Sequence, residues 1–229
     1  MLKKHDLARV ADDADVLSWV EDVKRTALTH QRLLLPFAHE QRVPAAATFT
    51  YTNHVYRSGF DNWIYSARAA LTTPAVLAMD EQTYNAFAAR NVSVLLLHDS
   101  ESVALAKRSL YIKAEFTHRL LAAGLRTIFS EMDIFWVNDP QLIEDRELDL
   151  QASEQGYGKD DINFGFYMAQ PTRAARSLFR RLARWPPEPH TMLHCQCVQR
   201  SAPLTSHRVC VRQVAALAAV RALLGPGVL

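Results

Sequence analysis

Short apolar runs alternate with helix-like segments from residue 45 onward, and this alternation constrains the fold more than any other feature of the chain. Four of the runs are candidate strands. Strands that alternate with helices predict a parallel sheet covered by helices on both faces. We therefore expect the four strands to be neighbours in one sheet. They are Ala45–Thr50, Ala75–Met79, Val92–Leu97 and Arg126–Phe129.

Helices are predicted between and after these strands. A long helix begins near Val103 and ends at Gly124, because glycine readily takes the left-handed conformation that closes a helix. A fifth strand, around Asn163–Ala169, precedes a last helix. The predicted fold class is therefore α/β, with a mainly parallel sheet flanked by helices. The other predicted helices are Gly59–Ala70, Glu81–Arg90 and Thr172–Arg184.

The two ends of the chain differ from the segment between them. Residues 1–44 predict an N-terminal helical extension with a stripe of valines and a cap at Asp12 or Asp13. Residues 186–229 open with a proline cluster and contain neither aspartate nor lysine. We expect a main domain at 45–185 and a divergent C-terminal tail at 186–229 that contributes little to the core.

Charge is distributed unevenly, although the net charge is only +2. The segment from Pro171 to the C-terminus carries nine arginines and one acidic residue, Glu188. Four of these arginines recur at helical spacing, which predicts a solvated helix face and no nucleic-acid surface. They are Arg173, Arg176, Arg180 and Arg184.

Neither a membrane span nor a signal segment is predicted. No stretch approaches the roughly 20 apolar residues that a spanning helix needs. The early apolar run Leu33–Ala38 is interrupted by Pro36 and is too short for a signal-peptide core. The three cysteines all lie in the last 35 residues, so they provide no disulfide framework for the main domain.

Polar residues follow each of the four predicted strands. An open α/β sheet binds its ligands at the carboxyl ends of its strands, so these residues mark the predicted site. Polar residues also end strands for purely structural reasons. The residues are Thr52 and Asn53, Asp80, His98 and Asp99, and Glu131 and Asp133.

The acidic triplet Glu131–Asp133 is the most informative of these. In an extended backbone, residues two apart project to the same side, about 6.5 Å apart along the chain, so both carboxylates would face one way and Met132 would point inward. Two carboxylates at a strand end suit a hard divalent cation. Such a cation would bridge a diphosphate and absorb the charge of a departing nucleotide.

A second class of metal-dependent enzyme also places Asp-x-Asp after a strand, namely phosphohydrolases and mutases of the haloacid-dehalogenase type. Their first aspartate is the nucleophile, and threonine or valine usually follows the second. Here Glu131 stands first and Ile134 follows the second acid, which ranks this alternative far behind.

Four motifs in sequence order resemble a nucleotide-diphospho-sugar transferase family that includes plant arabinosyltransferases and rhamnogalacturonan xylosyltransferases. The acidic triplet lies within the segment Ser130–Pro140, Ser-Glu-Met-Asp-Ile-Phe-Trp-Val-Asn-Asp-Pro, which is similar to the family's S/D-x-D-hydrophobic-x-W-x-x-D-P signature. The other segments match the family's first strand with its helix, its second strand with an aspartate, and its D-x-Q-x-S … N-x-G-F region. They are Thr48–Asn53 with Asn62-Trp63, Leu77–Asp80, and Leu150–Ser153 with Asn163–Met168.

The resemblance implies a GT-A-type, Rossmann-like fold, Mn²⁺ or Mg²⁺ as cofactor, a UDP-sugar donor, retention at the anomeric carbon, and a glycan or glycoprotein acceptor. It implies a metal site at Glu131 and Asp133 and no particular nucleophile. It also implies a Golgi or secretory location, although the chain shows no anchor. The donor-binding candidates are Thr52, Asn53 and Asp80 near the nucleoside, Asn163 and Gly165 in a loop near the sugar, and Lys113 on the long helix, which would reach phosphate unless it is simply solvated.

Two alternatives remain open at this stage. The family's chain continues past the Asn-x-Gly-Phe region, and residues 186–229 contain no counterpart, so the protein would be a non-catalytic sugar-nucleotide-binding remnant without the acceptor half. A zinc site in the tail is the other alternative, formed by His190, His194, Cys195 and Cys197.

Overall fold

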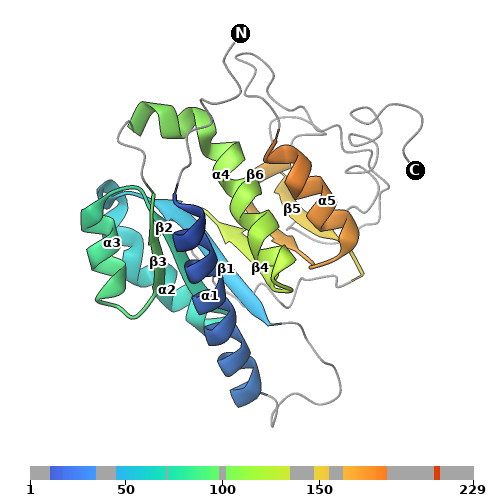
Figure 1. The fold of residues 1–229 in the computed structure, drawn as a ribbon, viewed down its shortest axis with the longest axis horizontal. Helices are drawn as coiled ribbons and strands as arrows, with labels where there is room; N and C mark the ends of the chain where they lie inside the picture. The colour runs from blue at the N-terminus through green and yellow to red at the C-terminus, as the bar shows by residue number, and fades with distance from the viewer. Residues whose placement is uncertain are drawn as a thin grey trace.

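The structure, a computed structural model, describes residues 11–34, 45–70, 72–97, 102–134, 147–154, 162–184 and 209–211. Within these ranges the strands form one sheet with helices on both faces (Figure 1). The strands are β1 (Ala46–Thr52), β2 (Thr73–Ala78), β3 (Ser93–Leu96), β4 (Arg126–Ser130), β5 (Leu150–Glu154), β6 (Ile162–Ala169) and β7 (Val209–Val211). The helices are α1 (Asp13–Leu34), the short 3₁₀ helix η1 (His54–Gly59), α2 (Phe60–Ala69), α3 (Glu81–Ala88), α4 (Ser102–Ala122) and α5 (Arg173–Leu182).

The sheet has a parallel half and an antiparallel half. Its strand order is β3-β2-β1-β4-β6-β5-β7. The first four strands pair in parallel, and the pairings from β4 onward are antiparallel. The parallel order 3-2-1-4 is that of Rossmann-like folds. The predicted α/β class is confirmed, and the four predicted strands are neighbours as expected.

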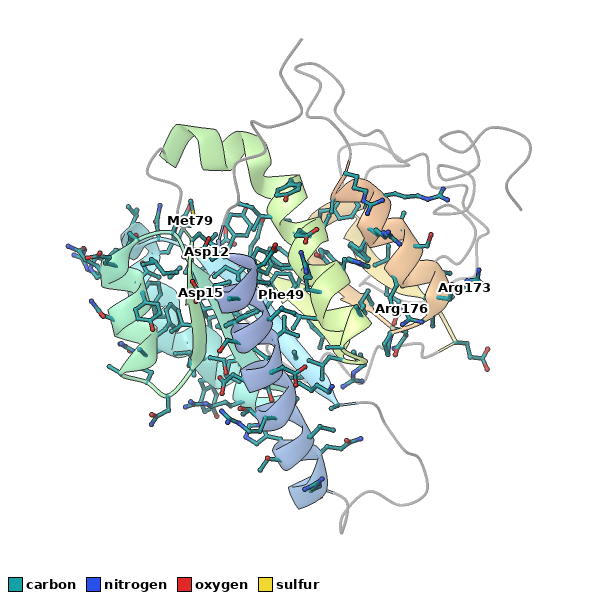
Figure 2. The ribbon with its side chains drawn as sticks, in the orientation of Figure 1. Asp12, Asp15, Phe49, Met79, Arg173 and Arg176 are labelled. Atoms are coloured by element: carbon teal, nitrogen blue, oxygen red, sulfur yellow. The ribbon has the colours of Figure 1, made fainter. Side chains whose placement is uncertain are left out.

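Helices α1, α4 and α5 cover one face of the sheet (Figure 1). Their apolar side chains form one cluster with inward-facing residues of the strands, including Phe49, Phe129 and Tyr167. Phe49, labelled in Figure 2, is fully buried there. The valine stripe predicted from the sequence is part of this cluster, so α1 belongs to the core of the domain.

Helices α2 and α3 cover the opposite face. Strand residues alternate between the two faces, as the pleat requires: Ala75 and Leu77 belong to the first cluster, whereas Val76 lies between them and packs with Trp63 and Phe87. Because both faces are covered, β1, β2 and β4 are almost continuously buried, whereas the edge strand β3 is only partly buried.

Two predicted helix features are confirmed in detail. Gly124 has a φ of +84° and ends α4, and the N–H of Leu125 donates to the carbonyl oxygen of Leu120, as in a Schellman motif. The four arginines on and after α5 are exposed, as a solvated helix face predicts; Arg173 and Arg176 are labelled in Figure 2. Among the described helices, none has the length and apolarity needed to cross a membrane.

Strands β5 and β7 were not predicted from the sequence. Strand β7 lies in the expected C-terminal tail, yet it pairs antiparallel with β5, with Cys210 opposite Ala152. For these three residues the prediction of a tail apart from the domain is wrong, because their backbone completes the outer edge of β5. The predicted zinc ligands of the tail, as well as His98 and Asp99, lie outside the described residues.

Candidate functional site

The order of the strands reverses at β1 and β4. The chain runs outward from β1 to β2 and β3, and α4 then returns it to β4 on the other side of β1. The carboxyl ends of two strands at such a reversal are where open α/β sheets bind ligands. The residues that follow β1 and β4 are Asn53 on one side and the acidic triplet Glu131–Asp133 on the other.

Residues Glu131–Ile134, named here the acidic turn, leave β4 in a tight turn. The N–H of Ile134 donates to the carbonyl oxygen of Glu131 at 3.1 Å, and the N–H of Glu131 donates to the carbonyl oxygen of Gly165 at 2.8 Å. The extended geometry predicted for the triplet is therefore wrong: β4 ends at Ser130, because the pairing with β6 fixes Glu131 and the chain folds back after it. Met132 does point inward, where it is 5% exposed and packs in the cluster beneath α2 and α3.

The two carboxylates of the acidic turn have different surroundings. Asp133 is exposed. The Glu131 side chain is 43% exposed, and its Oε1 accepts a hydrogen bond from Lys113 Nζ at 2.7 Å. The turn thus presents one carboxylate to solvent and holds the other in an ion pair.

Lys113 is buried on α4, with only 7% of its side chain exposed. Besides Glu131, its ammonium donates to the carbonyl oxygen of Phe164 at 3.1 Å. Its nitrogen also lies 4.8 Å from the centroid of the Phe129 ring and 5.8 Å from that of Tyr51, within the range of cation–π attraction. The expectation of a solvated helix lysine is wrong, because the side chain is enclosed where α4 crosses β4 and β6.

Aromatic rings beneath this lysine continue the junction into the core. The rings of Phe129 and Tyr167 stack at a centroid distance of 5.3 Å, and Tyr167 stacks in turn on Phe179 at 5.5 Å. The Tyr167 hydroxyl lies 2.6 Å from that of Thr117. Burial raises the pKa of Tyr167 far above its usual range, so this phenol stays protonated. Sequence reasoning missed these contacts, because no spacing along the chain relates α4 to β6.

Asp80 holds the turns that follow β1 and β2. Its Oδ1 accepts from the N–H of Thr83 at 2.7 Å, which caps α3, and its Oδ2 accepts from the N–H of His54 at 2.9 Å. Partial burial acts to raise the pKa of this carboxyl, but the backbone N–H groups of Thr83 and His54 outweigh it and leave the pKa below its usual value. Asp80 therefore serves the local backbone at the place where a nucleoside contact was predicted.

The two candidates after β1 are also locally engaged. Asn53 caps η1, and its Oδ1 accepts from the N–H of Val55 at 3.1 Å. Thr52 is 2% exposed, and its backbone carbonyl oxygen accepts from the N–H of Met79 at 2.9 Å. These residues shape the edge of the site rather than present unused side-chain oxygens to it.

Asn163 and Gly165 lie within strand β6, so the predicted loop near the sugar is wrong. Gly165 is buried, and its carbonyl oxygen accepts the hydrogen bond from the N–H of Glu131. The structure brings Gly165, Lys113 and Glu131 together, which the sequence did not predict.

A separate polar hollow of about 470 Å³ lies at the opposite, amino-terminal edge of β2 and β3. Two pairs of its polar side chains are hydrogen-bonded to each other: Ser93 Oγ donates to Asp22, and the Thr73 hydroxyl lies 3.4 Å from His30 Nδ1. It sits away from the strand ends where α/β sheets bind ligands, so the acidic turn remains the candidate site.

The donor set of the acidic turn fits a hard divalent cation in part. Among the described residues, no group of three or more His, Cys, Asp or Glu side chains is placed to enclose a metal. Mg²⁺-type sites that serve phosphate substrates, however, typically use one or two carboxylates and complete their shell with phosphate oxygens and water. An exposed Asp133 next to a half-exposed Glu131 meets that requirement.

A family model for nucleotide-diphospho-sugar transferases matches residues 69–194, more than half of the chain. A comparison with curated proteins gives no match. Among solved structures, the glycosyltransferase GlyE of Streptococcus pneumoniae TIGR4 is similar, with 14% sequence identity and a TM-score of 0.38. The alignment covers 59% of this chain and 36% of the length of GlyE.

Proposed function

This chain belongs to the nucleotide-diphospho-sugar transferase family, and we propose that it transfers a sugar from a nucleoside diphosphate donor to a glycan or glycoprotein acceptor. The observation that carries the proposal is the acidic turn. It places Asp133 exposed at the carboxyl end of β4, at the strand reversal where the diphosphate of a nucleotide would lie.

In this proposal, the diphosphate of the donor would bind near the acidic turn together with Mn²⁺ or Mg²⁺. The residues that would hold the cation are Asp133 and Glu131. When bound, the cation supplies positive charge that neutralises the diphosphate as it departs. The protein contributes the position of the carboxylates, which the β4–β6 pairing and the turn fix before the donor arrives.

The nucleoside would extend from the acidic turn toward the ends of β1 and β2. There Asp80 holds η1 and α3 at a fixed relative position through two backbone hydrogen bonds. Asn53 fixes the first turn of η1. Their contribution is a preformed edge for the nucleoside, which lowers the ordering cost of binding. We further propose a UDP-sugar donor, a retaining reaction and a secretory-pathway location, on the motifs that resemble the plant members of the family.

Isothermal titration of the protein with UDP, GDP and ADP, each with and without MnCl₂, tests the proposal. We expect UDP to bind in the presence of Mn²⁺ and to bind at least about tenfold more weakly in its absence, because the carboxylates alone repel the diphosphate. Binding that is indifferent to Mn²⁺, or a failure to bind any nucleoside diphosphate, would contradict the proposal.

A transfer assay separates catalysis from binding. Release of UDP from UDP-sugars is followed with and without a panel of glycan acceptors. Turnover supports the transferase. Nucleotide binding without turnover on any acceptor would favour the sugar-nucleotide-binding remnant.

A further inference from the structure

The Lys113 side chain connects its own helix, α4, to the strands β4 and β6. It extends from α4, its ammonium is bonded to Glu131 after β4 and to the backbone of Phe164 in β6, and it lies over the ring of Phe129 in β4. Because only 7% of the side chain is exposed, the charge has little contact with water. A donor phosphate would have to displace these partners to reach it, so the enclosure argues against Lys113 as a phosphate ligand.

Glu131 is held at three points. Its side chain accepts from Lys113, its N–H donates to Gly165 and its carbonyl oxygen accepts from Ile134. Asp133 belongs to the same turn but is exposed. The position of Asp133 therefore depends on the anchoring of Glu131 two residues earlier.

We infer that Lys113 is a positioning residue, that Glu131 acts as its counter-ion, and that Asp133 is the carboxylate that meets the cation. This inference rests on the proposed function and narrows it. A divalent cation at Glu131 would lie close to a buried ammonium that already occupies Oε1, and the two positive charges would repel. Asp133, by contrast, is exposed and forms no ion pair with the described residues, so its carboxylate is available to a cation.

The ion pair also sets the charge of the acidic turn. With Glu131 neutralised by Lys113, the turn carries one net negative charge, that of Asp133. A single carboxylate binds a free divalent cation weakly, whereas a diphosphate adds the oxygens and the negative charge that complete the shell. We therefore expect the cation to bind together with the nucleotide, and Mn²⁺ alone to bind weakly.

Three single variants test the inference: Asp133→Asn, Glu131→Gln and Lys113→Met. Each is titrated with UDP in MnCl₂ and with MnCl₂ alone, and the melting temperature is measured without metal. Lys24→Met is the matched control, because Lys24 is partly exposed and lies in an i,i+3 pair with the exposed Glu21 at 3.9 Å on α1. We expect this control to match the wild type in both measurements.

Asp133→Asn is expected to lose Mn²⁺-dependent UDP binding and to keep its melting temperature, since the side chain is exposed and makes no hydrogen bond or ion pair with the described residues. Glu131→Gln is expected to bind UDP within about threefold of the wild type, because glutamine still accepts from Lys113, but to melt earlier, because a buried charge has lost its counter-charge.

Lys113→Met is expected to fold, since it removes a buried charge and leaves Glu131 half exposed to water. It should weaken Mn²⁺-dependent UDP binding about tenfold, as typically follows the loss of a residue that orients a metal ligand. It should also tighten the binding of Mn²⁺ alone, because Glu131 is no longer neutralised. A residue that is merely structural would change neither affinity.

The results separate this inference from the proposed function. If Asp133→Asn and Glu131→Gln lose UDP binding equally and neither melts earlier, Glu131 is a direct ligand and the inference is wrong while the metal site stands. Unchanged UDP and Mn²⁺ affinities in a folded Lys113→Met protein also overturn it. If Asp133→Asn binds UDP and Mn²⁺ normally, the metal site of the proposed function fails as well. Should Lys113→Met fail to fold, the comparison between Glu131→Gln and Asp133→Asn decides.

Discussion

The carboxyl edge of β1 and β2 and the junction of β4 with β6 use polar residues in opposite ways. At the first, the oxygens of Asp80 and Asn53 bond to backbone N–H groups of the turns that follow the strands. At the second, Glu131 bonds to the buried Lys113 and leaves Asp133 exposed. At the acidic turn the backbone of Glu131 bonds to Gly165 and Ile134, so the Asp133 side chain is not needed for local hydrogen bonds and stays available to a ligand.

The largest expected effect lies at the junction. Phe129→Ala removes a fully buried ring that contacts Tyr167, Phe49 and the Lys113 ammonium. We expect the free energy of unfolding to fall by about 3–5 kcal/mol, measured by urea denaturation. Tyr65→Ala is the control: Tyr65 is 75% exposed, and its loss should change stability by less than about 0.5 kcal/mol. Equal effects of the two variants would show that the aromatic stack does not support the junction.

An intermediate effect is expected at the edge of β1 and β2. Asp80→Ala removes the cap of α3 and the bond to His54, which should cost about 1–2 kcal/mol at pH 7. Glu81→Ala, which removes an exposed acid from the same helical turn, should cost less.

The effect of Asp80→Ala should depend on pH in a defined direction. The folded pKa of Asp80 lies below its usual 3.8, so the charged form stabilises the fold above that value and its contribution is lost as the pH falls through the folded pKa. The difference in stability between wild type and variant should therefore be constant above about pH 5 and shrink below about pH 4. A gap that widens in acid would contradict the assigned hydrogen bonds.

The smallest effect concerns a single hydroxyl at the junction. Tyr167→Phe keeps the stacked ring but removes the bond to Thr117, which should cost about 1 kcal/mol. Tyr84→Phe on the surface, at 37% exposure, should be neutral. If Tyr167→Phe were as damaging as Phe129→Ala, the hydroxyl network rather than the stacking would hold α4 to β6.

The parallel half of the fold could be predicted from the sequence because its signals are local. Apolar runs such as Ala75–Met79 read as buried strands, and Gly124 marks the end of α4 without reference to any partner. The antiparallel half offered weaker signals. Strand β7 lies beyond a proline cluster, and its position becomes clear only through its pairing with β5.

The candidate site could also be predicted only where its signals are local in the sequence. The motif identified Glu131 and Asp133, and the strand order brings them to the reversal point. The extended geometry failed because the turn depends on Gly165, which lies more than 30 residues away in the sequence. The role of Lys113 was hidden because its partners, Glu131 and Phe164, lie 18 and 51 residues from it.

The pairing of β1 with β4 has a consequence for how the protein is made. It joins Ala46 to Arg126, and the acidic turn is fixed only when Gly165 is in place beside Glu131. Contacts between such distant residues form late, because a long loop must close before they contribute. During synthesis, β1 emerges from the ribosome well before the strands on its β4 side. The nascent chain can therefore assemble β1, β2 and β3 early, but it acquires an ordered acidic turn only after β6 has been released.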